Sequence, residues 1–496
     1  MQARAARERR RARPRGRRRR SREPEPAARA ATYGDRAAPA PRQGDRGWSR
    51  AARRAAWSAG RLGGRLSWRV GRRLLLGLRR AGRVAWRSGL PRQLGARVRV
   101  AFPGAALLML LALFACVRQL PPEPRPAQPA TRSVYQSEPQ VRVALLETAP
   151  EVRLTLDAEW QLASEGGARA QVPPGELVIR PEGDGLAASG VASHDWPAAR
   201  SLRLRTATPA PPGEPGPAFE LNGKRYRGEL EVRRLESGAL QAINHVGLED
   251  YLAGVLGHEM PLRWPDAAVE AQAIAARTYA LSELKPRAAF DLYADTRSQV
   301  YGGVTGEDAR AREILTRTRG RILTSQGELF VTYFHSTCGG DTVPARWIFP
   351  WVKQEIAPLE GASGCRCQGS RYYRWEETRD LSREVKELVL ELPLRQLTVE
   401  HWPRGGYVKS LRIVDAGGDV ETISGWDARR AFGLRGYAWD AGLSPDGRSV
   451  RFQGRGWGHG VGLCQWGARG FAQDGMDARA ILARFYPGAV IELQGY

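Results

Sequence analysis

The sequence predicts an α+β protein in which a single membrane anchor precedes a strand-rich part and a helix-containing core. Three observations predict this class. Apolar and polar side chains alternate in runs across residues 140–245, with glycine and proline between the runs, as is typical of antiparallel strands. Residues 265–281 form an alanine-rich run with helix-starting chemistry, and residues 100–117 contain no charged side chain, which suits one short membrane span.

The first 99 residues carry the charge of the whole chain. They contain 31 Arg, no Lys and 5 acidic residues, which leaves 46 basic and 47 acidic side chains for the rest of the sequence. With few apolar residues before position 62, this segment cannot bury enough surface to order itself, so we expect a disordered, basic, cytoplasmic segment. Such a tail can bind nucleic acid or acidic lipid. An arginine-biased coding background, or a start codon placed too far upstream, would also explain it.

The anchor follows a second basic stretch. Residues 61–90 interleave Leu and Trp with Arg, which indicates a cationic amphipathic helix on an anionic membrane surface. The arginine excess before residues 100–117 predicts a cytoplasmic amino terminus. Two outcomes stay open for this span. It is either an uncleaved anchor or a lipoprotein-type signal, because Cys116 ends a short run that resembles a lipobox.

A proline-rich linker at 118–139 then serves as an extended spacer. We expect the outer domain to comprise residues 140–496, with the strand-rich part at 140–245 and the helix-containing core at 246–496. Because this domain is nearly neutral in charge, we expect no nucleic acid partner for it.

Glu259 is the first candidate for chemistry. It lies shortly before the alanine-rich helix, among apolar neighbours such as Leu256 and Met260, and Pro265 suits the start of that helix. Burial raises the pKa of a carboxyl group, as a general acid working near neutral pH requires. The alternative is structural: Glu259 caps the helix or pairs with Arg277, a charged side chain that its small neighbours predict to be internal.

Cysteines provide a candidate metal site. Apart from Cys116 the sequence has Cys338, Cys365, Cys367 and Cys464. His335 with the first three supplies one imidazole and three thiolates, a plausible tetrahedral zinc site, while Cys464 receives no role. A disulfide from Cys338 to either member of the C-x-C pair, or free thiols, stay open. A zinc ion with four protein ligands would be structural; with three, a zinc-dependent hydrolase becomes conceivable.

A glycine-tryptophan block at 454–475 is a candidate sugar-binding surface. Glycines allow a ligand to approach the backbone, and amide or imidazole donors such as His459 and Gln465 suit sugar hydroxyls. The alternative is a tight turn that requires positive φ, with His459 buried and hydrogen-bonded. Gln299 and Tyr301 are expected to border the same cleft, where they orient a sugar or hold the catalytic carboxyl; the alternative is that they are core hydrogen-bonding residues.

Four ordered blocks over about 240 residues resemble the SpoIID/LytB family. They are LEDYLAGVLGHEMPLRWPDAAVEAQAIAARTYAL at 248–281, DTRSQVYGG at 295–303, YFHSTCGGDT at 333–342 and GRGWGHGVGLCQWGARGFAQDGMDARAILARFYPG at 454–488. Because the blocks recur in the family's order, the resemblance is far more specific than one short motif.

This resemblance implies a membrane-anchored lytic transglycosylase facing the periplasm or cell wall. The enzyme would cleave the bond between N-acetylmuramic acid and N-acetylglucosamine in peptide-stripped peptidoglycan strands and form an anhydro sugar. Glu259 matches the family's catalytic glutamate, and Arg277 and Tyr279 are expected in supporting, substrate-binding roles. Some family members bind zinc near the HST segment, which supports a structural zinc ion. The family also implies an alternative, a non-catalytic peptidoglycan-binding enhancer of a cell-wall amidase.

Overall fold

The computed structural model describes residues 137–207, 216–382, 388 and 390–496. The expected basic segment at 1–99, the anchor at 100–117 and nearly all of the linker at 118–139 therefore lie outside the described residues. Within the described part, no helix is both long and apolar enough to cross a bilayer.

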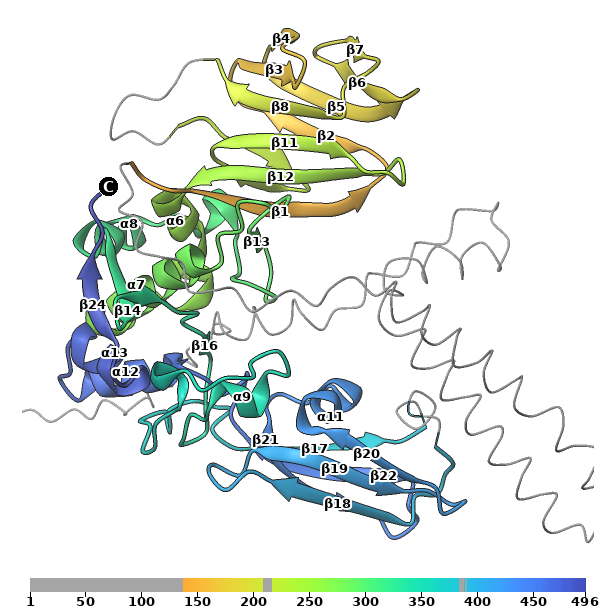
Figure 1. Cartoon of the computed structure of the whole chain (residues 1–496), viewed down its shortest axis with the longest axis vertical. Coiled ribbons are helices and arrows are strands. Elements are labelled where there is room, and N and C mark those ends of the chain that lie inside the picture. Colours follow the sequence, from red (N-terminus) through yellow and green to blue (C-terminus); the bar gives the residue numbers. More distant parts are fainter. Residues whose placement is uncertain (1–136, 208–215, 383–387, 389) are drawn as a thin grey trace, which may run out of the picture. The chain divides into compact units, whose positions relative to one another are not determined.

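The strand-rich part consists of two sheets (Figure 1), and the predicted α+β class is confirmed. One sheet has seven strands in the order β13-β1-β12-β11-β8-β3-β4, and the other has six in the order β10-β9-β2-β5-β6-β7. The strands are β1 (Gln140–Ala149), β2 (Val152–Leu156), β3 (Trp160–Ser164), β4 (Arg169–Val172), β5 (Gly175–Glu182), β6 (Gly185–Gly190), β7 (His194–Trp196), β8 (Ser201–Thr206), β9 (Phe219–Leu221), β10 (Lys224–Tyr226), β11 (Glu229–Arg234), β12 (Leu240–Gly247) and β13 (Leu292–Tyr293).

Alternation of side chains explains these strands. In β2 the apolar residues Val152, Leu154 and Leu156 are buried, whereas Arg153 and Thr155 between them are exposed. Successive strand residues point to opposite faces, so each sheet turns an apolar face inward. Buried residues of both sheets belong to one hydrophobic core, which also includes the helices that follow.

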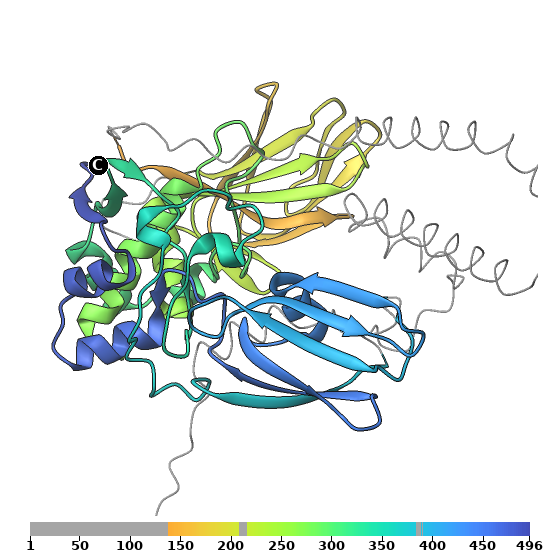
Figure 2. The same cartoon turned by 60° about the horizontal axis from the view of Figure 1, so that its bottom comes forward.

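The helical core is built around α7. Its elements are α6 (Leu248–Glu259), α7 (Asp266–Ser282), η3 (Gly303–Gly306), α8 (Ala309–Arg317), β14 (Arg321–Ser325), β15 (Glu328–Leu329), α12 (Gln465–Gln473), α13 (Ala478–Phe485) and β24 (Val490–Leu493). Helices α6, α8, α12 and α13 pack against α7, and in Figures 1 and 2 the green α6 and α7 lie beside the blue α12 and α13. Nearly all of α7 is buried because its alanines let neighbours approach from every side.

A smaller unit with its own core lies between the two strands β16 (Phe334–His335) and β23 (Leu463–Cys464). It contains two three-stranded sheets, β17-β22-β21 and β18-β19-β20. The remaining elements are α9 (Ala345–Ile348), η4 (Ala357–Leu359), β17 (Trp375–Asp380), β18 (Gln396–His401), β19 (Val408–Val414), β20 (Val420–Ser424), α11 (Gly425–Phe432), β21 (Ala438–Leu443) and β22 (Ser449–Arg455). Because β16 and β23 pair in parallel, with His335 opposite Cys464, two distant blocks of the sequence meet.

Candidate functional site

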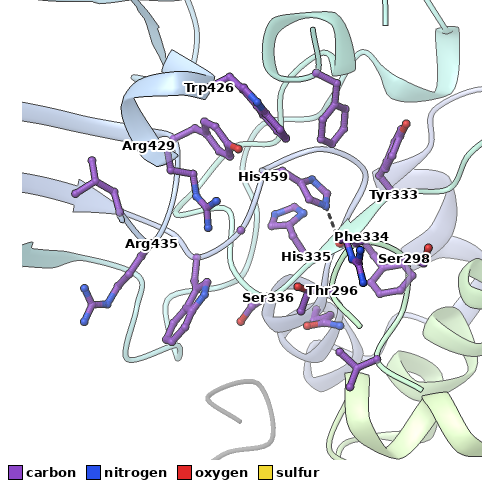
Figure 3. Close-up of a pocket in the computed structure, with 18 of the residues that line it drawn as sticks. Thr296, Ser298, Tyr333, Phe334, His335, Ser336, Trp426, Arg429, Arg435 and His459 are labelled. Atoms are coloured by element: carbon purple, nitrogen blue, oxygen red, sulfur yellow. Dashed lines mark hydrogen bonds between the residues drawn. The ribbon is translucent and has the colours of Figure 1, made fainter. Parts of the chain in front are cut away.

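A cleft of about 900 Å³ collects residues from the helical core and from the smaller unit (Figure 3). This volume lies near the upper end of the range of roughly 300–1,000 Å³ usual for ligand pockets. Three of the residues expected from the sequence to act on substrate are in its lining together with Glu259: Tyr279, His459 and Gln465.

Glu259 is the last residue of α6 and is held by two donors. The Val300 N–H donates to Oε1 at 2.8 Å, and the Gln465 side-chain amide donates to Oε2 at 3.4 Å. The sequence placed this carboxyl in a turn before the next helix, whereas the structure places it at a helix carboxyl end. It keeps some exposure to the cleft and is enclosed by protein on its other sides.

Removal from water raises the pKa of Glu259 to about 7, and the two donors only partly offset this effect. The carbonyl groups at the end of α6 also disfavour a negative charge there, because the helix dipole is negative at this end. Both protonation states are therefore populated at neutral pH. Such a group can donate a proton and then accept one.

Glu259 is the sole acidic side chain among the described residues that line the cleft. Asp250, Asp266 and Asp295 are absent from the lining, and each pairs with an arginine. The described residues therefore bring no second carboxylate into the lining of this cleft.

Arg277 lies in the core, away from the cleft. Its side chain is 0% exposed and pairs with Glu249 at 2.7 Å. Arg277 therefore does not pair with Glu259, which was the structural alternative. It also does not reach the cleft, where the sequence led us to expect a contact with substrate. The physical reason is helix geometry: Tyr279, two residues later, points about 200° around α7 from Arg277 and reaches the cleft instead.

Gln299 and Tyr301 also face the core. The Tyr251 hydroxyl donates to Gln299 Oε1 at 3.0 Å, and the Tyr301 hydroxyl donates to Asn244 Oδ1 at 2.9 Å. This is the core hydrogen-bonding role that the sequence left open. The two side chains fix the segment between them so that the N–H of Val300 reaches the carboxyl of Glu259. A backbone donor gives no residue-type signal, which is why sequence reasoning missed it.

The two histidines of the cleft differ in how many of their ring nitrogens are hydrogen-bonded. His459 Nε2 donates to the Phe334 carbonyl at 2.8 Å (dashed in Figure 3), and its Nδ1 accepts from the Val461 N–H at 3.1 Å. His335 Nδ1 donates to the Val461 carbonyl at 3.1 Å, while its Nε2 is buried without a hydrogen-bond partner. Burial lowers the pKa of His335 to about 4 and that of His459 well below its usual range. Both rings are therefore neutral, and His335 Nε2 is an unpaired, buried acceptor among the described residues.

The glycine-tryptophan block forms the tight turn that was one of its two alternatives, and its sugar-binding role stays a prediction. Gly456, Gly458, Gly460 and Gly462 all have positive φ, as a tight turn requires, and His459 is hydrogen-bonded within it. The same turn also supplies lining residues to the cleft.

Four cysteines form a buried cluster of metal-binding type beside this turn. They are Cys338, Cys365, Cys367 and Cys464, and their Sγ atoms all lie within 4.8 Å of one another. All four are free thiols, so no disulfide joins them. Cys338 and Cys367 have their Sγ atoms 3.6 Å apart, near the edge of about 3.8 Å that four 2.3 Å zinc–sulfur bonds define in a tetrahedron.

Backbone N–H groups donate hydrogen bonds to two of the cysteine sulfurs. The N–H of Gly340 donates to Cys338 Sγ at 3.4 Å, and the N–H of Gly467 donates to Cys464 Sγ at 3.3 Å. Gly467 also leaves room for the Cys365 sulfur, which a Cβ at this position would meet. Hydrogen bonds of this kind favour the charged form of a metal ligand.

The fourth member of this cluster corrects the ligand set expected from the sequence. His335 is not in the group, and Cys464, for which the sequence indicates no role, takes its place. The reason is the β16–β23 pairing, which brings Cys464 to the other three thiols while the ring of His335 turns to the cleft. Gln465, the next residue after Cys464, begins α12 and contacts Glu259, so the cluster fixes one wall of the cleft.

The fold and the cleft together define an α+β protein with one carboxyl of raised pKa in the described lining of its cleft and a four-thiol centre beside it. Residues 236–325 match the family described as Stage II sporulation protein, SpoIID. An uncharacterized protein of Brachyspira hyodysenteriae is 30% identical over 278 residues, which cover 55% of this chain and 74% of that protein. The chain belongs to the SpoIID family.

Two further relatives carry functional names. Stage II sporulation protein D of Bacillus subtilis is 27% identical over 278 residues, covering 51% of this chain and 76% of that protein. The amidase enhancer of Bacillus subtilis is 23% identical over 320 residues, covering 55% of this chain and 45% of that protein.

Proposed function

We propose that this protein is a lytic transglycosylase that cleaves the bond between N-acetylmuramic acid and N-acetylglucosamine in peptide-free peptidoglycan strands. The observation that carries the proposal is a single buried carboxyl, Glu259, whose pKa is raised to about 7 in a cleft whose described lining holds no other acidic group. One such group suffices when the substrate supplies its own nucleophile.

Glu259 acts twice in this mechanism. Protonated, it gives its proton to the glycosidic oxygen, so the departing N-acetylglucosamine leaves as a neutral alcohol. The carboxylate then takes the proton of the C6 hydroxyl of the muramic residue as that oxygen bonds to C1, which closes a 1,6-anhydro ring. The donors from Val300 and Gln465 hold the carboxylate in place between the two steps.

Glycoside hydrolysis and a non-catalytic role are the two alternative functions. Glycoside hydrolysis typically uses two carboxyl groups about 5 to 9 Å apart, and the cleft's described lining offers one. A non-catalytic role, as the name of the amidase enhancer suggests, would leave the raised pKa of Glu259 without a use. Each alternative makes a different product, or none.

Product analysis tests the proposal. The full-length protein is incubated with intact and with peptide-free glycan strands, and the released fragments are weighed by mass spectrometry. Anhydro ends from the peptide-free strands are expected. Reducing ends would mean a hydrolase, and an absence of fragments, with faster release of peptides by an added amidase, would mean an enhancer.

The activity should depend on pH through Glu259. The acid step needs the protonated carboxyl, and the pKa of Glu259 is about 7. We therefore expect kcat/KM to be constant below pH 7. Above pH 7 it should fall about tenfold per pH unit. Initial rates between pH 5 and pH 9 check this. A decline centred near pH 4.5, the ordinary range of a carboxyl, would contradict a raised pKa.

We also propose that the four-thiol centre holds a structural zinc ion, bound by Cys338, Cys365, Cys367 and Cys464. The donor set fits, because four thiolates close the coordination shell and leave no position for water. When bound, the ion supplies a cross-link between the chain around Cys338, the loop at 365–367 and the start of α12. The catalytic proton transfers stay with Glu259.

For the remainder of the chain we propose the organisation that the sequence predicts. A basic cytoplasmic segment at 1–99 precedes a membrane anchor or lipoprotein-type signal at 100–117 and a linker at 118–139. The outer domain at 140–496 then faces the periplasm or cell wall, where glycan strands and a cell-wall amidase are its expected partners. Mass measurement of the mature protein separates the two anchors, since lipidation would leave Cys116 as the first residue.

A further inference from the structure

Helix α11 contributes a second, separate set of groups to the cleft. Trp426 and Arg429 are three residues apart, so they lie on one helix face, and both line the cleft. The Trp426 ring stacks on Tyr437 with an interplanar angle of 14°. Trp351 stands against Trp426 with the ring centroids 5.1 Å apart and is 54% exposed.

Trp351 is an exposed indole in the lining of the cleft. Ligand pockets are lined mainly by apolar and aromatic side chains, so this ring is available to a ligand. Trp351 meets Trp426 edge-on, at an interplanar angle of 88°, and Trp426 stacks on Tyr437. We call these three rings the aromatic wall. Its flat faces suit the apolar face of a sugar ring.

Arg429 differs from the other arginines of the cleft in its lack of a carboxylate partner. Arg297 pairs with Asp295 and Glu147, whereas Arg379 and Arg435 share Glu377. Among the residues that the structure describes, no acidic side chain pairs with Arg429.

The contacts that Arg429 does make are weak for a cation. Its guanidinium lies 5.2 Å from the centre of the Tyr437 ring and hydrogen-bonds that side chain, and its Nε is buried without a partner. In Figure 3 it extends toward His459 and His335, while Arg435 points away from them. A partly buried guanidinium without a carboxylate partner is a ready site for an anion, since pairing would recover the cost of its desolvation.

We propose that Arg429 and the aromatic wall form a subsite for an acidic sugar, in which the ring stacks on the wall and a carboxylate binds the guanidinium. The ligand class is a glycan with a free carboxylate on one sugar. This inference rests on the proposed function, where the carboxylate is the lactyl group of N-acetylmuramic acid.

The subsite gives a chemical reason for a preference for peptide-free strands. A stem peptide is attached through the lactyl carboxyl, which then is a neutral amide without charge for Arg429. Removal of the peptide exposes a carboxylate, and the guanidinium can bind it with charge-assisted hydrogen bonds. Arg429 would thus be the residue that distinguishes the two substrates.

Binding without turnover tests the subsite. Full-length protein carrying Glu259→Gln is titrated by calorimetry with a peptide-free tetrasaccharide of alternating N-acetylglucosamine and N-acetylmuramic acid, and with the same compound after its carboxyls are converted to methylamides. The acid form is expected to bind about ten- to a hundredfold more tightly, as charged hydrogen bonds typically give. Adding Arg429→Gln should remove this difference by lowering the affinity for the acid form to near that for the methylamide form.

Two further variants show whether the preference for the acid form depends on Arg429 itself. Arg430→Gln removes the same charge from the next position of α11, where the side chain is exposed and outside the lining, and should retain the preference. Arg429→Lys, which keeps the charge, should restore part of it and serves if Arg429→Gln fails to fold. Equal affinity of the Glu259→Gln protein for the acid and methylamide forms would overturn the proposal without any variant of Arg429.

The two proposals fail separately in this design. If the acid preference depends on Arg429 but wild-type protein forms no anhydro product, the subsite stands and the transglycosylase proposal is lost. If anhydro products form but acid and methylamide strands bind alike, the reverse holds.

Discussion

Glu259→Gln is expected to lower turnover of peptide-free strands by roughly 10²- to 10⁴-fold, the usual share of a general acid–base group. The amide keeps the shape of the carboxyl and can still accept from the Val300 N–H that now reaches Oε1 at 2.8 Å. The amide cannot donate a proton to the glycosidic oxygen and then accept one from the C6 hydroxyl. Binding of the strand should therefore persist while the release of anhydro fragments is lost.

A surface variant provides the comparison. Glu313→Gln removes one carboxylate from α8, where the side chain is 63% exposed, and should leave the rate unchanged. Rates are measured as anhydro ends formed per unit time at pH 6.5. Undiminished activity of Glu259→Gln would show that this carboxyl does no chemistry, and the amidase-enhancer function would then be favoured.

The same substitution has an expected signature in stability. The pKa of Glu259 is about 7 in the folded protein against 4.5 for an ordinary glutamate, so the folded state holds its proton more tightly than the unfolded chain. The wild-type protein then loses stability as the pH rises from 4.5 through 7, by up to about 3 kcal/mol. Glu259→Gln lacks this loss and should unfold at a higher temperature than wild type at pH 8, with a smaller difference at pH 5.

Helix α7 was predictable from the sequence, but α6 was not. Pro265 immediately precedes the first residue of α7, and the alanine run marks an internal helix. Helix α6 includes Gly254 and Gly257, which lower helix propensity, and it is buried on most sides and so lacks a clear apolar stripe. A Cβ on Gly254 would come within 2.6 Å of the Tyr301 ring, so close packing outweighs propensity at that position.

The fourth cysteine of the metal-binding cluster could not be predicted from the sequence either. His335 and Cys338 are three residues apart, and such spacing favours a joint role in any reading of a sequence. The partner that completes the cluster, Cys464, lies 126 residues beyond Cys338. It arrives through the parallel pairing of β16 with β23, strands of two residues each that leave almost no pattern. Long-range pairing of short strands is decided by the whole core.

Cys464→Ser and His335→Gln are expected to separate the two ligand sets. If the four thiols bind zinc, purified wild-type protein should contain about one zinc ion per chain. Cys464→Ser should lose most of it on dialysis, because three ligands remain, whereas His335→Gln should keep it. Zinc bound at structural sites can contribute on the order of 10 kcal/mol to folding. Even a partial loss should therefore lower Tm by roughly 5–10 °C.

The loss of zinc should also reach the chemistry, since Cys464 directly precedes Gln465, whose amide lies 3.4 Å from Glu259 Oε2. Cys464→Ser is expected to release the start of α12 and reduce the rate of anhydro product formation, with a chelator acting on wild-type protein in the same way. His335→Gln is the matched control for zinc content, because it leaves the four thiols intact. Zinc retained by Cys464→Ser but lost from His335→Gln would restore the ligand set that spacing alone favours, and a metal-free wild type with reactive thiols would remove the zinc proposal entirely.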